Sequence, residues 1–469
     1  IVPVAGSIAV LPLLNESNDP NQEYFSDGLS EELITALAQV RGLRVISRNS
    51  SFQFRGAQQH DDVRIGRKLG VATLLEGAVS KQGDKVRIHA SLVNAADGSM
   101  LWSQSYDREL KDIFAVQRDI AKSVAGALKV TLLGELPVSS GQPPGGNLAA
   151  YNALLQGNYR LAPLSEGNLR KAIGFYDDAI HLEPAYALAY AKRSYAWRAL
   201  AGQFLGGQAA ADAGTRARAD ARAALALDPN LAAAHVALGF VLKDSDFDFT
   251  GAETEFRRAV EKAPEDADAK DGLAVLLADL GRFEEAVGLT REALLLDPLH
   301  GAWYLNLASN LVSLDRFDQA EQAIHKSIAL QPDAAVNYMM LTIIEIKRGH
   351  PDAALQAAQH ERADAWRRYA LALAQQARGD HAAADAALRS LIDKYAAAAP
   401  FQIASVYAFR KQPDQAFQWL DRAWAARDPG VTELLGDPFF SEYRHDPRFI
   451  AFCEKVGLPA PANTTPSRS

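Results

Sequence analysis

The sequence predicts an α+β protein in which a small α/β domain is followed by an all-α, right-handed superhelix of helix pairs. Three observations lead to this prediction. Small residues and prolines recur about every 34 residues over half of the chain, polar and apolar residues alternate over residues 85–93, and a Pro- and Gly-rich stretch separates the two patterns. A period of this length is typical of helical repeats, whereas strict alternation is typical of a strand with one wet face.

Residues 1–132 are expected to form the α/β domain. Strands over 7–13 and 44–48 flank a helix over 27–40 with one apolar face, which predicts a βαβ start. The segments expected to follow are a short helix over 61–69, strands over 72–79, 85–93 and 100–106, and a closing helix over 112–130. In the strand over 85–93, the side chains expected to face water are those of Lys85, Arg87, His89 and Ser91.

A linker, a repeat region, a cap and a tail are expected to complete the chain. Residues 133–148 include Pro137, Pro143 and Pro144 among several glycines, a composition typical of a linker. Helical repeats are expected over 149–430. Residues 431–459 are expected to form one or two short helices that cover the last repeat, and residues 460–469 a disordered tail.

The repeat signal consists of small residues and prolines in a fixed register. The prolines, separated by 45, 35, 34 and 34 residues, are Pro184, Pro229, Pro264, Pro298 and Pro332. Alanine stands twelve residues before each proline, and another small residue, as in Ala179 or Ser327, stands five before it. Small residues let two helices approach closely, and proline cannot continue a helix. The register therefore predicts closely packed helix pairs, each ending at a proline.

This pattern resembles the tetratricopeptide repeat family. The register continues past Pro332 through Ala354, Ala384, Ala404 and Ala416, which predicts about eight units. The first two units depart from the family pattern by Gly-rich insertions near 164–168 and 202–207, and units six and seven lack the terminal proline. The resemblance implies a superhelix whose concave groove binds a protein or peptide.

The α/β domain has a resemblance of its own. The segments that carry it are Ile8–Pro12, Tyr24–Leu33, Arg44–Arg48, Ile65–Gly70, Leu75–Gly77 and Leu101–Ser103. They are similar to a bacterial domain related to the amino-terminal part of TolB, which commonly precedes tetratricopeptide repeats. Members of that family often carry a cytoplasmic winged-helix, adenylate cyclase or kinase domain and then one membrane helix. The resemblance therefore implies a periplasmic region, tethered to the inner membrane by a helix upstream of Ile1; a cytoplasmic location is the alternative.

Composition and motifs argue against several classes of function. Residues 1–132 carry 15 Lys+Arg and 15 Asp+Glu, so the net charge of −8 falls on the later part, and nucleic acid is not an expected partner. No apolar run approaches the roughly 18 residues of a membrane span, so direct membrane insertion by this region is not expected. Phosphate-binding loops and GxSxG or HExxH motifs are absent, the histidines are scattered, and the single cysteine, Cys453, is interpreted as a buried apolar residue. We expect no enzyme activity, no cofactor and no bound metal.

The candidate partner-binding residues follow from the resemblance, because the first helix of each tetratricopeptide pair lines the concave surface. The Ala/Pro register places there Tyr195, Arg198, Lys243, Asp268, Asp271, Met339, Lys347, Trp366, Tyr369 and Gln376, with Asp244 and Asp279 in the same register. Trp366 and Tyr369 are the expected anchors, since aromatic side chains contribute most to recognition. Packing against the neighbouring repeat is their alternative role.

Three hypotheses about function remain open from the sequence. The leading one is the extracytoplasmic sensing and interaction region of a bacterial membrane-anchored signalling protein, which relays occupancy of the groove by flexing. A soluble scaffold for assembly of a protein complex is the first alternative. The second is a small-molecule receptor or enzyme centred on residues 1–132, which requires a deep pocket lined by polar groups. Candidates to hold a small anion there are Arg48, Arg55, Arg64 and Arg67, although such charges more often solvate a sheet edge.

Overall fold

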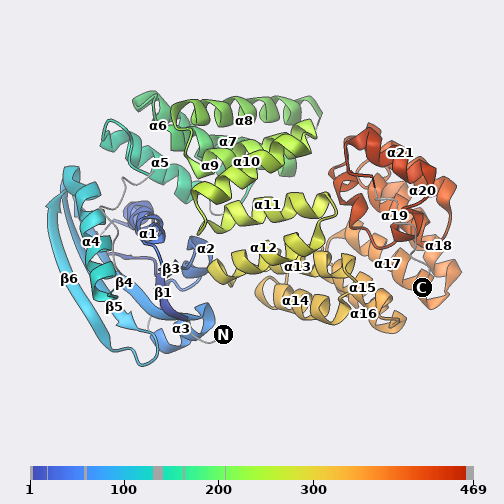
Figure 1. The fold of residues 1–469 in the computed structure, drawn as a ribbon, viewed down its shortest axis with the longest axis horizontal. Helices are drawn as coiled ribbons and strands as arrows, with labels where there is room; N and C mark the ends of the chain where they lie inside the picture. The colour runs from blue at the N-terminus through green and yellow to red at the C-terminus, as the bar shows by residue number, and fades with distance from the viewer. Residues whose placement is uncertain are drawn as a thin grey trace, which may run out of the picture. The chain divides into compact units, whose positions relative to one another are not determined.

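The computed structural model describes residues 4–17, 19–56, 61–129, 141–161, 164–205 and 207–460 (Figure 1). The chain divides into two compact units, and each is described by itself. The first unit comprises residues 1–241, 254–270 and 292–299, and the second comprises residues 242–253, 271–291 and 300–469. Over the described ranges, no helix combines the length and the apolar character that crossing a membrane requires.

The first unit begins with the α/β domain. Its elements are β1 (Val4–Val10), β2 (Leu14–Asn15), η1 (Pro20–Gln22), α1 (Glu23–Ala38), β3 (Arg44–Val45), α2 (Arg48–Ser51), α3 (Asp62–Leu69), β4 (Val71–Gln82), β5 (Lys85–Asn94), β6 (Met100–Glu109), η3 (Leu110–Asp112) and α4 (Ile113–Ala127). The strand order is β3-β1-β4-β5-β6, with β2 paired to β4. The pairs of β1 with β3 and β4 are parallel and the last two pairs are antiparallel, so β1, α1 and β3 form the expected βαβ unit.

One face of the sheet carries the main core of this domain. Val86, Ile88, Ala90 and Leu92 of β5 are buried there together with residues of α1 and α4. On the opposite side, Lys85, Arg87 and His89 are exposed as expected, but Ser91 is only 5% exposed. This second face of the sheet is not exposed to solvent along its whole length, because α3 packs against β4.

The strand predicted over 44–48 ends earlier than expected, at Val45. Ile46 N still donates to Ile8 O of β1 at 2.9 Å, but Ser47 N donates instead to Leu296 O at 2.8 Å. The chain then turns into α2 at Arg48. A repeat helix thus takes the hydrogen bond that would have extended the strand.

The described residues between 148 and 425 form sixteen α-helices in sequence. Their bounds are α5 (Leu148–Leu161), α6 (Glu166–Leu182), α7 (Ala187–Phe204), α8 (Gly207–Leu227), α9 (Ala232–Val241), α10 (Phe249–Lys262), α11 (Ala267–Asp279), α12 (Phe283–Leu296), α13 (Gly301–Ser313), α14 (Phe317–Leu330), α15 (Asn337–Lys347), α16 (Pro351–His360), α17 (Asp364–Arg378), α18 (His381–Tyr395), α19 (Pro400–Phe409) and α20 (Pro413–Ala425). A π-helical turn, η4 (Leu242–Asp246), follows α9.

The small residues of the repeat register lie where the packing argument requires them. Fully buried, at 0% exposure, are Ala172, Ala179, Ala217, Ala224, Ala252, Ala259, Ala286, Ala293, Ala320 and Ser327. Each of the five register prolines stands two residues beyond the last residue of a helix, namely α6, α8, α10, α12 and α14. The second half of the chain therefore has the helix pairs of a tetratricopeptide repeat protein.

The first repeat helix, α5, shares the core of the α/β domain. Tyr151 and Leu155 of α5 are 2% and 1% exposed and belong to the same apolar cluster as the sheet residues. The Tyr24 hydroxyl of α1 donates to Asn152 Oδ1 at 2.8 Å. A Cβ atom on Gly28 would come within 2.6 Å of the Leu155 side chain, so glycine at this position lets α1 and α5 approach closely.

A second contact within the first unit joins the α/β domain to the end of α12. The Ser50 hydroxyl donates to the Asp297 carboxylate and accepts a hydrogen bond from Leu299 N at 2.8 Å. Asp297 is 2% exposed. Burial raises the pKa of Asp297 to about 7, and the hydrogen bond from Ser50 opposes this shift.

The second unit ends in a cap formed by η5 (Pro429–Leu435), η6 (Ser441–Tyr443) and α21 (Pro447–Val456). Its apolar side chains are buried, with Phe440 at 1% and Phe449 at 0% exposure. Cys453 is buried as well, and burial raises the pKa of its thiol to about 11. Residues 130–140 of the predicted closing helix and linker, and residues 461–469 of the predicted tail, lie outside the described residues.

Candidate functional site

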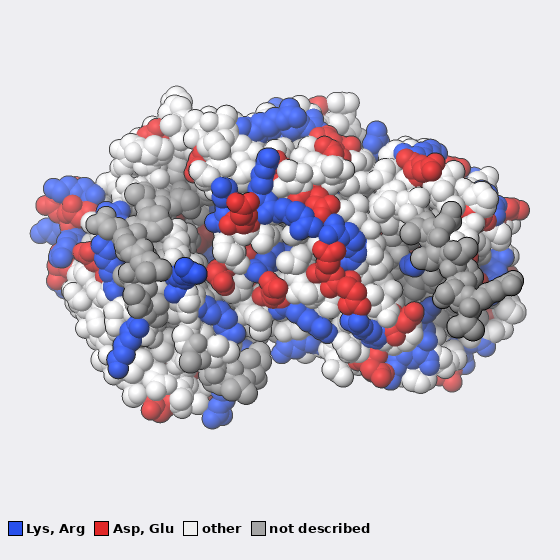
Figure 2. Space-filling model, in the orientation of Figure 1, with Lys and Arg blue, Asp and Glu red and all other residues white. Residues whose placement is uncertain are grey.

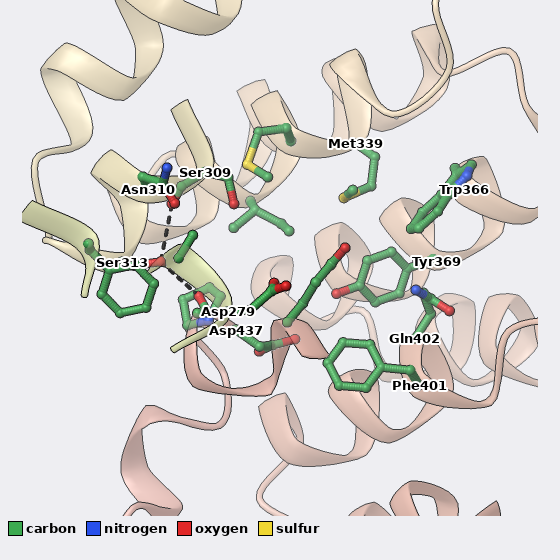
Figure 3. A pocket seen from close by; sticks show the side chains of 17 residues that line it. Asp279, Ser309, Asn310, Ser313, Met339, Trp366, Tyr369, Phe401, Gln402 and Asp437 are labelled. Carbon is green, nitrogen blue, oxygen red and sulfur yellow. Dashed lines mark hydrogen bonds between the residues drawn. The ribbon is translucent and has the colours of Figure 1, made fainter. Parts of the chain in front are cut away.

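The second unit contains a hollow on the side formed by the first helices of consecutive pairs (Figure 3). It encloses about 630 Å³ of empty space, part of which is open to solvent. We call it the groove; it is lined by residues of α11, α12, α13, α15, α17 and α19 and by residues 433–438 of the cap. The enclosed part is about 100 Å³, which is room for a partner side chain.

One wall of the groove is apolar and aromatic. Trp366 and Tyr369, one turn apart on α17, lie edge to face with ring centroids 6.3 Å apart. Met339 of α15 and Phe401 of α19 line the same space. Figure 3 shows these side chains together on one side of the hollow.

Tyr369 also has a packing role. Its side chain is 4% exposed, and its hydroxyl shares a 2.8 Å hydrogen bond with Ser405 Oγ. Burial raises the pKa of Tyr369 well above its usual value, so the hydroxyl stays neutral. Trp366 is only partly buried. Of the two predicted anchors, Trp366 therefore has the more accessible ring.

Three carboxylates, from Asp279, Glu433 and Asp437, line the floor of the groove. Asp279 at the end of α11 accepts a hydrogen bond from Lys243 Nζ at 2.9 Å. Lys243 stands on the π-helical turn η4 and also contacts Asp244 at 3.1 Å. Burial alone would lower the pKa of Lys243, but attraction to the two aspartates outweighs it and raises that pKa above its usual value.

The carboxylates of Glu433 and Asp437, which belong to the cap, are less fully balanced by nearby cations than that of Asp279. The Glu433 side chain is exposed to solvent, yet surrounding protein atoms raise the pKa of its carboxyl to about 7; Asp279 adds to this shift and Lys243 opposes it. Asp437 is half-buried and accepts a hydrogen bond from Phe439 N at 2.8 Å. Burial raises the pKa of Asp437 as well, and its hydrogen bonds oppose the shift. Negative charge on these carboxylates is unfavourable in free energy unless a cation lies close enough to balance it.

The opposite wall is polar and comes from α13. Ser309, Asn310 and Ser313 line it (Figure 3). Ser313 Oγ lies 3.0 Å from Gly436 O and 3.2 Å from Ser309 O, so it can donate to either carbonyl and tie the cap to α13. The cap is thus part of the groove wall as well as a cover for the last repeat.

The predicted partner-binding residues divide between the two units. Met339, Trp366 and Tyr369 are brought together in the groove, and Lys243 lies beneath it through its bond to Asp279. Of the remaining predicted residues in the second unit, those outside the groove lining are Asp271, Lys347 and Gln376. Lys347 Nζ lies 6.0 Å from the centre of the Phe317 ring. Tyr195, Arg198 and Asp268 belong to the first unit, where the Arg198 guanidinium lies 4.3 Å from the Phe240 ring centre.

Sequence reasoning missed two groups of groove residues. Ser309, Asn310 and Ser313 lie on the first helix of the unit that ends at Pro332, and extending the register to that unit would have identified them. The sequence predicts that Glu433 and Asp437 belong to the cap, without a role in the groove. No periodic signal marks them, because the cap does not follow the repeat.

The first unit has a second, more open hollow, lined by residues that include Pro229, His235, Glu255 and Arg258. His235 Nδ1 lies 2.6 Å from Glu255 Oε2 and its Nε2 lies 2.9 Å from Pro229 O, so both ring nitrogens have partners within the chain. Neither hollow includes a residue of the α/β domain. Three of the arginines considered for anion binding there, Arg48, Arg55 and Arg64, have carboxylate neighbours, and Arg55 Nη2 donates to both carboxylate oxygens of Asp27.

Charge is mixed over the face shown in Figure 2, where acidic and basic side chains alternate in the central part. Among the residues that the structure describes, no three His, Cys, Asp or Glu side chains are grouped closely enough to hold a metal ion. The groove carboxylates thus differ from a metal-binding cluster.

Comparison with known proteins finds a family model that is similar to the first domain. Residues 4–123 match the family model of the HilA/YgeH-like transcriptional regulator, second domain. The chain is 37% identical over 196 residues to a Rhizobium meliloti (strain 1021) protein named "Putative adenylate cyclase 3", covering 41% of this chain and 33% of that protein. It is also 37% identical over 82 residues to the Hsp70-Hsp90 organizing protein of Triticum aestivum, covering 18% and 14% respectively. The matches thus span a third or less of the length of these curated relatives.

Solved structures of helical repeat proteins are also similar to the chain. Pseudomonas aeruginosa pilF has 22% identity and a TM-score of 0.35, with 43% of this chain and 91% of that chain covered. A tetratricopeptide repeat protein from Parabacteroides merdae has 15% identity and a TM-score of 0.40, with coverage of 53% and 98%.

Proposed function

We propose that the chain is a non-enzymatic module that binds a protein or peptide in the groove of the second unit. The observation that carries the proposal is the convergence of first helices from consecutive pairs on one hollow with an aromatic wall and an acidic floor. An accessible aromatic ring supplies area for a partner side chain, and the α13 wall supplies polar contacts. Nucleic acid is not a proposed partner, which agrees with the net charge of −8.

We further propose that this module is the periplasmic sensing region of a bacterial membrane-anchored signalling protein, with a TolB-like α/β domain. The match to a regulator domain and the relative named as an adenylate cyclase support this, because both belong to effector classes that such proteins carry. The tether is a membrane helix elsewhere in the full-length protein.

The binding proposal is tested by exposing a peptide array to the chain and to two tryptophan variants. Trp366→Ala removes the accessible ring of the groove, whereas Trp424→Ala removes a ring of α20 that does not line it. We expect Trp366→Ala to weaken binding of selected peptides by roughly tenfold or more, and Trp424→Ala to leave it near the starting value. Equal binding by all three proteins would exclude the groove as the recognition site.

A soluble scaffold is the second candidate, favoured by the 82-residue match to an organizing protein. Protease accessibility in spheroplasts of the native bacterium separates the two proposals. Digestion of this region by external protease is the result expected for the periplasmic sensor. Protection until the inner membrane is lysed would contradict the sensor proposal and favour the scaffold.

A further inference from the structure

We infer that the groove binds a basic segment of its partner, with a Lys or Arg side chain placed between the aromatic wall and the carboxylates of Glu433 and Asp437. This inference rests on the proposed function and states which class of partner the groove selects. It follows from the charges, the aromatic surface and the shape of the same site.

The charge of the groove is not balanced by the chain itself. Its seventeen described lining residues include Asp279, Glu433 and Asp437 but no Lys or Arg. Lys243 is bonded to Asp279 and Asp244, so its attraction is largely shared between these two carboxylates, and it acts on Glu433 only through space. Lys347 acts on Asp437 electrostatically from outside the lining. A cation from a partner would find its counter-charge already in position.

The aromatic wall is also without a cation. Three other tryptophans have an arginine over the ring: Arg216 at 4.9 Å from the Trp197 centroid, Arg422 at 4.4 Å from Trp419, and Arg427 at 5.3 Å from Trp424. No described Lys or Arg lies over Trp366 or Tyr369. A guanidinium or ammonium over such a face gains a cation–π contact, and more when the site is partly shielded from water.

The shape of the site favours a side chain on a peptide over a free small cation. Met339 and Phe401 lie beside the aromatic pair and offer apolar surface to the methylene stem of Lys or Arg. The polar α13 wall faces them across the hollow and offers hydrogen bonds to a peptide backbone (Figure 3). An acidic segment or a terminal carboxylate would meet like charge at the floor.

The experiment measures fluorescence anisotropy of the full chain with end-blocked peptides in matched triplets. Members of a triplet share their apolar residues and differ only in carrying Lys, Gln or Glu at the same two positions. We expect the Lys member to bind roughly tenfold or more tightly than the Gln member, and the Glu member to bind most weakly. Spermidine, the small-cation probe, is expected to bind much more weakly than the Lys peptides.

Variants connect this preference to the groove. The double change Glu433→Gln/Asp437→Asn removes the charge while keeping the side-chain shapes, and it is expected to abolish the preference for Lys over Gln. Glu442→Gln, on η6 of the cap and paired with Lys411 at 3.3 Å, is the matched control and should retain the preference. Thermal unfolding of both variants checks that the fold is kept.

The outcomes separate the two proposals. If Trp366→Ala weakens peptide binding but the Lys, Gln and Glu peptides bind equally well, this inference is overturned and the proposed function stays intact. Spermidine binding as tightly as the Lys peptides would make the occupant a small cation and would also overturn it. Failure of every triplet to bind would contradict the proposed function, and this inference with it.

Discussion

Two regions of this protein use carboxylates in different ways. At the contact between the α/β domain and the end of α12 in the first unit, Asp297 is surrounded by protein and hydrogen-bonded to Ser50. In the groove of the second unit, Glu433 and Asp437 border an open space. The first arrangement is complete without a ligand, whereas the second is improved by one. Asp437 has hydrogen-bond partners in the chain as Asp297 does, so the open space beside a carboxylate is what distinguishes the recognition site from the structural contact.

The largest expected effect concerns the shared core at α1 and α5. Leu155→Ala should destabilise the first unit by about 2–5 kcal/mol, because it leaves a cavity beside Gly28 in the α/β core. Leu182→Ala, at a leucine that is 43% exposed, is the control and should cost less than about 1 kcal/mol. Urea unfolding followed by circular dichroism measures both. Equal, small losses would show that the α/β domain does not depend on the first repeat helix.

A second prediction tests the buried carboxylate of Asp297. Because the pKa of Asp297 is raised from 3.8 to about 7, the native state binds more protons than the unfolded state between these values. The free energy of unfolding of the wild type should therefore fall as the pH rises through this range. Asp297→Asn removes this contribution, so the variant should gain roughly 1–3 kcal/mol relative to the wild type between pH 4 and pH 8. A constant difference across that range would contradict the assigned burial of the charge.

A third prediction separates packing from recognition at the aromatic wall. Tyr369→Phe keeps the ring but removes the hydroxyl bonded to Ser405, and should cost about 1 kcal/mol of stability. Peptide affinity should stay nearly unchanged, since the hydroxyl is already occupied inside the chain. Thermal unfolding and anisotropy, measured on the same sample, report the two quantities. A large loss of affinity with unchanged stability would assign the hydroxyl to the partner.

A fourth prediction concerns how peptide affinity of the groove depends on pH. Glu433 becomes charged as the pH rises through about 7, so affinity for a Lys-containing peptide should increase by roughly threefold between pH 6 and pH 8. Other charges that act on this carboxyl are those of Asp279, Lys243, Asp437 and Asp428. Glu433→Gln should flatten the profile. A profile that is unchanged in the variant would mean that another of these groups titrates.

The smallest effect is expected in the first unit. Tyr195 is 37% exposed, and although the register predicted it as a partner contact, it does not belong to the groove. Tyr195→Ala should alter stability by less than about 1 kcal/mol and should leave binding of groove-dependent peptides unchanged. A loss of affinity comparable to that of Trp366→Ala would extend the recognition surface to the first unit.

The parts of the site that follow the repeat could be predicted, and the parts that interrupt it could not. Met339, Trp366 and Tyr369 were found because each stands at a fixed distance from the small residues that pack the helices. Glu433 and Asp437 lie in the cap, where sequence spacing gives no information on which residues turn toward the last helices. Their carboxylates change the groove from a mixed surface into an acidic one.

The sequence by itself determined the two kinds of structure and the packing of the helices. Alternation defined the wet and buried sides of β5, and the Ala/Pro register defined which small residues are buried between helices, because both are consequences of local geometry. The tertiary structure alone decided that Tyr151 and Leu155 complete the α/β core, that Ser47 bonds to α12, and that the cap forms the groove floor. These contacts join residues far apart in the chain, and no local periodicity encodes which distant surfaces meet.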